Sequence, residues 1–467
     1  MLNFFNRQSF ILYLILLTLA ILTIFFQLNF EDLWLDEMNS FYVADPEVSI
    51  DETINRHKKT DWHNTMLFNL ILKNFLSIFG YDSEIARYLP FIFGGLSIAI
   101  IGIISYEIKK DNSYLLTTLL ACLSIYIIKY SQEIRPYTLL IFLSSINVYL
   151  YVKLNNSNIK IIKYLVFLLF IFFSVLNYSA NPFSLIIFFS QISNSLAKFF
   201  FFKKKHLLFF IAVPLISIFY IIFNLEYLIF QISFKKYMLS SDIVNVIDGL
   251  YFPRFFGSKI MGYFYLISLI SLIIFNRKKV FREDNEYLFL TLLFFYTYLI
   301  PLLYGLIKTP VLHDRYIIFV LIPIFILISC LSTSLKSTRI KKIFILTIVI
   351  LTSSNHVIEI FDRKNTKPEF NNILNYIKNT NNKDIIFYNP KDTSELVLNY
   401  INNLNEEKNY NLKIYNFNKT SEVLNYAWFL CYTPMVNFNC KIPNTLEWQK
   451  ISTIKFLHVE AHLFKLN

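Results

Sequence analysis

Stretches of about twenty apolar residues recur along this chain, and each is long enough to cross a bilayer as a helix. Only 16% of the 467 residues are charged and 55% are hydrophobic, whereas ordinary soluble domains carry about 25% charged residues. The pattern predicts an integral membrane protein. We expect about eleven spans, near residues 9–28, 85–106, 114–130, 136–152, 161–178, 183–202, 207–224, 260–275, 287–307, 316–335 and 343–357.

The basic residues predict the orientation of these spans. The net charge is +12, but Lys and Arg lie in short clusters between apolar stretches, which is typical of topology-setting charge and not of a nucleic-acid groove. Arg7 precedes the first stretch, and no small-residue cleavage site follows it, so we expect an uncleaved signal anchor. With a cytoplasmic N-terminus, the connections denser in Lys and Arg face the cytoplasm. The chain is then a multi-pass protein of the plasma (inner) membrane with its C-terminus outside.

Composition divides the chain in two. Residues 1–357 form the expected membrane domain, with long outer loops at 29–84 and 225–259. Residues 358–467 are rich in Asn, Lys, Asp and Glu, and predict a small soluble extracytoplasmic α/β domain. We expect helices and strands there at 369–378, 384–388, 394–402, 412–417 and 428–431. The fold class is therefore an all-α polytopic membrane protein, with a small α/β C-terminal domain.

The four cysteines exclude a disulfide-rich scaffold, and the Cys and His spacings match no zinc site. Cys431 and Cys440 both lie in the C-terminal segment, on the oxidising side of the expected topology, so we expect a disulfide between them. Cys122 and Cys330 lie in spans, where cysteine serves in packing.

Polar residues gather on the expected outer face at four places: 36–37, 61–63, 133–135 and 313–315. The inner face carries only basic loops. Acids can take a proton, and guanidinium groups bind phosphate through paired hydrogen bonds. The combination suits an anionic, lipid-linked substrate.

Each place also has a purely structural interpretation. Asp36 and Glu37 could stabilise the first turn of a helix, and Arg135 could mark the start of a span at Pro136. His313 and Arg315 could belong to a local pair with the acid between them.

The order of four segments carries a family resemblance. "LWLDEMNSFYVA", "DWHNTMLFNLILKNFLSIFGYDSEIARYLPFIFGGLSI", "KYSQEIRPYTLLIF" and "HDRYIIFVLIPIFIL" together resemble the GT-C glycosyltransferases of the protein-mannosyltransferase-like superfamily. That group includes the aminoarabinose transferase of lipid A and the Rgt-type transferases of lipopolysaccharide core. The likeness covers most of the first 335 residues. It implies transfer of a sugar from a polyprenyl-phosphate carrier to an acceptor on the outer face, with inversion.

The resemblance also implies roles for individual residues. Asp36, with Glu37 beside it, takes the catalytic place as base or acceptor-orienting group. Donor phosphate binding falls on Arg135 and Arg315, with weaker candidates at Lys58 and Lys59. Further substrate contacts are implied at His63, Arg87, Glu133, Tyr137, His313 and Tyr316. In the family, two prolines and then tyrosines follow the residue that matches His63. Both prolines and the tyrosines are absent from the matching positions of this sequence.

The expected partners are a polyprenyl-phosphate sugar donor, membrane lipid, and an acceptor that is lipid A, lipopolysaccharide core, another glycan or a protein. The sequence implies no cofactor with certainty. Adjacent acids could bind a divalent metal ion, although no further ligand spacing supports one. Two alternatives stay open: a transporter or flippase, which would carry polar groups within its spans, and a polymerase or ligase of lipid-linked saccharides.

Overall fold

The computed structural model describes most of the chain, and every structural statement below concerns these residues: 7–61, 65–156, 160–202, 207–233, 249–282, 286–308, 310–380, 384–387, 394–416, 425–433 and 448–466. Within them, nine helical segments are long and apolar enough to cross a membrane. They are α1 (Arg7–Phe25), α5 with α6 (Ser83–Ala86, Tyr88–Lys109), α9 (Tyr137–Asn156), α10 (Lys160–Ala180), η2 with α11 (Pro182–Ser184, Leu185–Phe202), α12 (Leu207–Ser233), α17 (Tyr287–Ile307), η4 with α18 (Asp314–Val320, Leu321–Ser332) and α19 (Thr338–Phe361).

Two of the eleven expected spans differ from this set. The stretch at 114–130 is not one helix but a pair, α7 (Ser113–Cys122) and α8 (Ile125–Ser131), bent by 55°. The hydroxyl of Ser124 begins α8 by accepting a hydrogen bond from the Ile127 amide at 3.4 Å. The stretch at 260–275 is α15 (Lys259–Phe275), which has 17 residues and is shorter than the nine candidate spans. The described residues thus contain up to ten spans, one fewer than expected.

Two expected boundaries also move. Helix α12 does not end at 224: the backbone bends at Asn224 and the helix continues to Ser233. After it the structure describes η3 (Gly249–Tyr251) and α14 (Phe252–Phe255), with the short α16 (Arg277–Val280) following α15. Helix α19 runs to Phe361, past the expected domain boundary at 357. Apolar stretches therefore predicted the spans well, but helical hydrogen bonding carries some helices beyond their apolar core.

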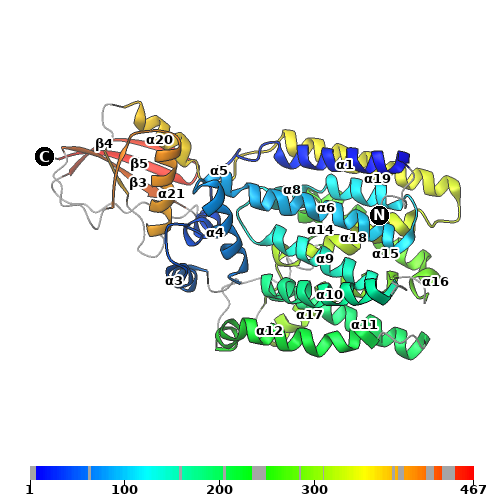
Figure 1. Ribbon diagram of the computed structural model, residues 1–467. Helices are drawn as coiled ribbons and strands as arrows, with labels where there is room; N and C mark the ends of the chain where they lie inside the picture. Colours follow the sequence, from blue (N-terminus) through cyan, green and yellow to red (C-terminus); the bar gives the residue numbers. More distant parts are fainter. Residues whose placement is uncertain are drawn as a thin grey trace.

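The spans lie side by side as a bundle with two distinct ends (Figure 1). The N-terminus lies at one end, and the C-terminal sheet lies beyond the other. The expected first outer loop, between α1 and α5, folds at the sheet end into α2 (Leu35–Val43), α3 (Ile50–Thr60) and α4 (Leu67–Phe79). The loop is therefore a structured layer between the bundle and the sheet.

The C-terminal segment forms the expected α/β unit. Strands β1 (Asp384–Phe387), β2 (Lys413–Asn416), β3 (Tyr426–Tyr432), β4 (Trp448–Phe456) and β5 (Val459–Leu466) make one sheet in the order β2-β1-β3-β5-β4. β1 is parallel to β2 and β3, whereas β5 is antiparallel to β3 and β4. In the register, Ile385 lies opposite Trp428. The hairpin of β4 and β5 was not predicted, although β5 alternates between apolar and polar residues over Val459–Leu463.

The helices α20 (Phe370–Lys378) and α21 (Ser394–Glu407) bury their apolar residues in the same cluster as one face of the sheet. That cluster extends into the first outer loop, because Leu33, Met38 and Phe41 share it with Phe370 and Tyr400. One continuous core therefore joins the C-terminal unit to α2.

Candidate active site

The first turn of α2 carries two adjacent acids with opposite surroundings. Consecutive residues on a helix point about 100° apart, so Asp36 and Glu37 face different neighbours. The Asp36 side chain is 31% exposed, and its Oδ2 lies 3.1 Å from Nη1 of Arg315. Glu37 has no exposed surface at all. Of these two acids, only Asp36 has a side chain that a ligand can reach.

Arg315 lies at the start of η4, at the sheet end of the bundle, and its side chain is 20% exposed. The guanidinium lies over two aromatic rings, 5.7 Å from the centre of Tyr137 and 5.5 Å from that of Tyr316. The Tyr316 ring stacks on Phe183 at 5.4 Å. The Nε of Arg315 is buried and has no hydrogen-bond partner within the described residues. Arg315 is therefore held in place with donor capacity to spare.

Arg135 occupies a closed position beside this pair. Its Nη1 donates to the backbone oxygen of Asp36 at 3.0 Å, to Ser40 Oγ at 3.1 Å and to Asp61 Oδ2 at 3.2 Å. Burial lowers the pKa of Arg135, but Asp61, Tyr137 and Asp36 together outweigh burial and raise that pKa. Arg135 is only 3% exposed. Its hydrogen bonds to Asp36 and Ser40 hold α2 in place.

Glu37 performs the capping task that was one interpretation of the acid pair. Its Oε2 accepts from the Trp34 amide at 3.4 Å, at the start of α2. Its Oε1 accepts from the Ile134 amide at 3.0 Å, in the connection between α8 and α9. Lys367 donates to Oε2 at 2.6 Å. The two interpretations of the acid pair thus divide between its members: Glu37 secures the helix, and Asp36 remains open.

Two further predicted contact residues are enclosed with Glu37. Arg87 is 4% exposed, donates to the Leu28 carbonyl at 3.3 Å and places Nε 3.9 Å from Glu37. Glu133 lies 3.9 Å from Lys367. Burial raises the pKa of Glu133, nearby Glu37 raises it further, and Lys367 opposes both. The structure does not bring these two side chains to the open side of α2.

His313 and its neighbours form a second ionic group next to Arg315. The His313 imidazole pairs with Asp314, whose Oδ2 also lies 3.2 Å from Nη1 of Arg254. Arg254 is on α14, and its side chain is 55% exposed. The exposed guanidinium of Arg254 thus pairs with Asp314, the residue that directly precedes Arg315 in the sequence.

The remaining predicted residues lie farther out or cannot be placed. Lys58 and Lys59 are exposed on α3, and Lys58 pairs with Glu226 at 3.2 Å. His63 lies outside the described residues, as does Cys440, so the expected Cys431–Cys440 disulfide is not tested. Cys122 and Cys330 are free and buried in the bundle. Among the described residues, no three His, Cys, Asp or Glu side chains cluster as metal ligands.

Sequence reasoning missed Lys367 and Arg254 as members of this region. Lys367 lies in an Asn- and Lys-rich segment where nothing distinguishes it from other lysines. Arg254 had one signal, its position after Phe252–Pro253 in the loop expected at 225–259. Both depend on contacts between segments far apart in sequence.

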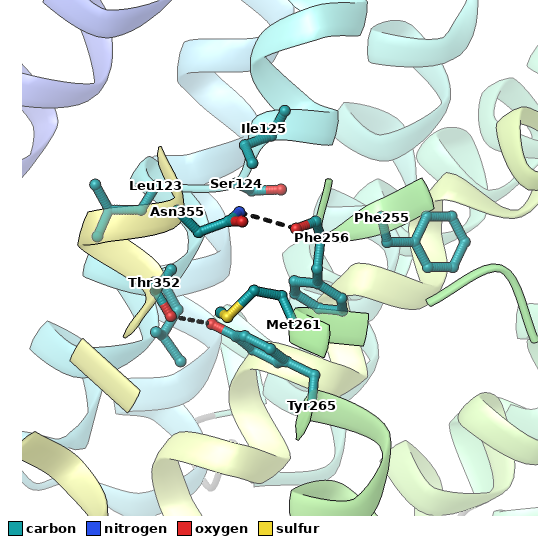
Figure 2. A pocket seen from close by; sticks show the side chains of 10 residues that line it. Leu123, Ser124, Ile125, Phe255, Phe256, Met261, Tyr265, Thr352 and Asn355 are labelled. Carbon is teal, nitrogen blue, oxygen red and sulfur yellow. Dashed lines mark hydrogen bonds between the residues drawn. The ribbon is translucent and has the colours of Figure 1, made fainter. Parts of the chain in front are cut away.

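A separate small pocket, with a volume of about 10 Å³, lies where α7 meets α8, α14, α15 and α19. Figure 2 shows two hydrogen bonds in its wall, from Asn355 to the Phe256 carbonyl and between Tyr265 and Thr352, at 2.9 and 2.7 Å. None of the ten residues that line it is a predicted site residue. The bent α7–α8 pair thus opens a small pocket apart from Asp36.

Comparison with known proteins gives similarity in structure only. No protein-family model and no curated protein sequence matches the chain. ArnT from Cupriavidus metallidurans bound to undecaprenyl phosphate superimposes with a TM-score of 0.61 at 9% identity, over 98% of both chains. Its apo state gives 0.61 at 8% identity, over 96% of this chain and 97% of that one. The Archaeoglobus fulgidus oligosaccharyltransferase in complex with Zn and sulfate gives 0.51 at 10% identity, over 89% and 67%.

These likenesses extend over nearly the whole chain, including the C-terminal unit. The chain therefore has the fold of ArnT, that of a multi-pass membrane protein with a small C-terminal α/β unit. Similarity at this level of identity establishes the fold alone.

Proposed function

We propose that this protein is an integral membrane glycosyltransferase that moves a sugar from a polyprenyl-phosphate donor to an envelope acceptor on the outer face, with inversion. One observation carries the proposal: an open acid, Asp36, is paired at 3.1 Å with Arg315 at one end of the bundle. The fold around this pair is shared with ArnT, which was solved bound to undecaprenyl phosphate. The acceptor is lipid A, lipopolysaccharide core, another glycan or a protein.

The donor already carries its leaving group, so the protein must stabilise the departing phosphate and activate the acceptor. Arg315 suits the first task because its side chain is 20% exposed and its charge is held over two rings. A planar guanidinium binds phosphate oxygens through paired hydrogen bonds. Exposed Arg254 supplies a second cation nearby.

Asp36 suits the second task because it is the acid left open by the packing of α2. In the transfer step it accepts the proton of an acceptor hydroxyl while that oxygen bonds to the anomeric carbon. The bond from that carbon to the phosphate oxygen breaks, and polyprenyl phosphate leaves with the electron pair. Attack from the side opposite the phosphate inverts the anomeric centre. With an acceptor that is already anionic, Asp36 only orients it.

The other predicted residues take supporting roles in this proposal. Glu37, Arg135, Arg87 and Glu133 fix the helix and connection that carry the site, since all four are buried and bound by protein groups. Tyr137 and Tyr316 hold Arg315. Lys58 and Lys59 remain exposed and can attract the anionic headgroup of the donor at the membrane surface.

One observation favours transport as a second candidate function. Buried polar side chains connect α9, α10, α11 and the start of α17 inside the bundle: Asn147 accepts from Gln191 at 2.6 Å, and Lys198 binds Glu286 at 2.7 Å. Polar groups within spans often mark a transport path. A transporter leaves the donor bond intact, so purified protein would release no undecaprenyl phosphate from a lipid-linked sugar.

Mass spectrometry of envelope glycolipids and glycoproteins tests the proposal. Cells that lack the protein should lose one sugar modification, and wild-type protein should restore it. Asp36→Asn should fail to restore it, because the amide cannot take the acceptor proton. Asp51→Asn is the matched control, an exposed acid of the same outer loop on α3. Full restoration by Asp36→Asn would contradict the proposed role of Asp36.

A further inference from the structure

We propose that Lys367, from the C-terminal segment, is a positioning residue that holds α2 so that Asp36 faces Arg315. The C-terminal unit thereby completes the active site instead of standing beside it. This inference rests on the proposed function for its consequence on transfer. Its structural part concerns only how α2 is held.

Lys367 reaches α2 from a segment that is itself fixed in place. The segment follows α19, and Arg363 binds Glu31 at 2.8 Å. Thr366 adds two hydrogen bonds to the same carboxylate, from its amide at 2.7 Å and its hydroxyl at 2.9 Å. The Lys367 amide donates to Asn365 at 3.1 Å, which closes a local turn. Lys367 itself is 7% exposed.

The charge of Lys367 is shared by two buried acids. Its Nζ lies 2.6 Å from Glu37 and 3.9 Å from Glu133. The only other cation that the structure records within 4 Å of the Glu37 carboxylate, among the described residues, is Arg87 at 3.9 Å. Without Lys367, two enclosed carboxylates would face each other with too little positive charge. Such a site must change geometry or bind a proton.

A change at Glu37 reaches Asp36 directly, because the two residues are consecutive in the first turn of α2. Glu37 also accepts the Trp34 amide that begins the helix and the Ile134 amide beside Arg135. Arg135 in turn binds the backbone oxygen of Asp36. The position of Asp36 against Arg315 thus depends on a chain of contacts that ends at Lys367.

The test compares three variants of the full-length protein. Lys367→Met removes the positive charge, and Glu37→Gln combined with Lys367→Met removes both charges of the pair. Lys408→Met is the matched control, since Lys408 also joins the C-terminal unit to the membrane part, through Glu84, and the described residues give it no hydrogen bond or ion pair with α2. Each is examined by hydrogen–deuterium exchange of the amides at Leu35–Val43, by undecaprenyl phosphate binding, and by restoration of the envelope product in cells.

We expect exchange in α2 to become at least tenfold faster in Lys367→Met, and to return to within threefold of wild type in the double variant. Product formation should fall at least tenfold and recover in the same way, while affinity for undecaprenyl phosphate changes less than threefold. Lys408→Met should resemble wild type throughout. If Lys367→Met does not fold, recovery of folding by the double variant supports the same pairing.

Unchanged exchange in α2 of Lys367→Met, or a double variant no better than the single one, would overturn the inference. If wild-type protein forms no envelope product at all, the proposed function fails. The exchange result still decides whether Lys367 positions α2, so the two failures can be told apart.

Discussion

The two acids that begin α2 are adjacent in the sequence, but their ion pairs differ in partner, length and exposure. Asp36–Arg315 is 3.1 Å long, with side chains 31% and 20% exposed. Glu37–Lys367 is 2.6 Å long, with side chains 0% and 9% exposed. One pair can be opened by a ligand, and the other is sealed by protein. The difference teaches that adjacent acids in a motif need not share a task.

The contrast has a simple origin in helix geometry and tertiary packing. One face of the α2 turn is covered by the α8–α9 connection and by the C-terminal segment, which supply Ile134 and Lys367 to Glu37. On the other face, Asp36 accepts from Arg315 at the start of η4. A buried carboxylate needs a full set of partners, whereas a catalytic one must exchange its partner for substrate.

The largest effect that separates the two acids should be on the rate of transfer. Asp36→Asn removes the proton acceptor and should lower the rate per folded molecule by about 100- to 10,000-fold. Glu37→Gln keeps an acceptor for the Ile134 amide and should lower that rate less than about tenfold, although it should reduce the yield of folded protein. The measurement is single-turnover transfer normalised to folded protein. Equal losses in the two variants would remove the distinction between the acids.

Stability should show the opposite ranking of the two pairs. Lys367→Met leaves a buried carboxylate without its cation and should lower the free energy of unfolding by about 3–5 kcal/mol. Arg315→Met breaks a partly exposed pair and should cost about 0–1 kcal/mol. Unfolding of the purified proteins in one detergent measures both. A larger loss for Arg315→Met would show that the open pair, not the sealed one, holds α2.

A smaller, pH-dependent effect extends the comparison to another enclosed acid, Glu407, at the contact between the C-terminal unit and α5. Glu407 accepts the Ser83 amide at 2.7 Å and the Ser83 hydroxyl at 3.0 Å. Burial raises the pKa of Glu407 to about 7, with nearby Asp82 adding to the rise. Between pH about 4.3, the ordinary value, and 7, the folded protein therefore binds more protons than the unfolded one. The stabilisation present at low pH is lost as the pH rises through 7.

Glu407→Gln cannot ionise and should escape this loss. Its stability relative to wild type should increase by about 2 kcal/mol between pH 5 and pH 8, as measured by unfolding at both values. A difference between the two proteins that is the same at both pH values would show that Glu407 does not titrate in this range.

The sequence predicted the features that depend on neighbouring residues better than those that depend on contacts between distant segments. Apolar stretches located the spans, and short motifs located Asp36 and Arg315, because both signals are local. The bend between α7 and α8 was missed because Leu123 and Ser124 interrupt no apolar pattern. The β4–β5 hairpin was missed although apolar and polar residues alternate in β5 over Val459–Leu463.

The division of labour within the acid pair could not be predicted. It depends on Lys367, which lies 330 residues from Glu37. It also depends on the backbone amide of Ile134, and the identity of a side chain does not predict what its backbone amide binds. Arg135 shows the same limit: its motif was recognised, but only packing shows that Asp61 and Ser40 enclose it. Sequence motifs predicted which segments meet, and burial decided which side chains stay open.

Binding of undecaprenyl phosphate to purified wild type, Asp36→Asn and Arg315→Met tests the central claim most directly. The claim is that the open pair divides its work, with the arginine on the donor phosphate and the acid on the acceptor. Asp36→Asn should bind the lipid at least as tightly as wild type while transferring sugar about 100- to 10,000-fold more slowly, and Arg315→Met should bind it at least about tenfold more weakly. Equal loss of binding in both variants, or full binding by Arg315→Met, would contradict the account.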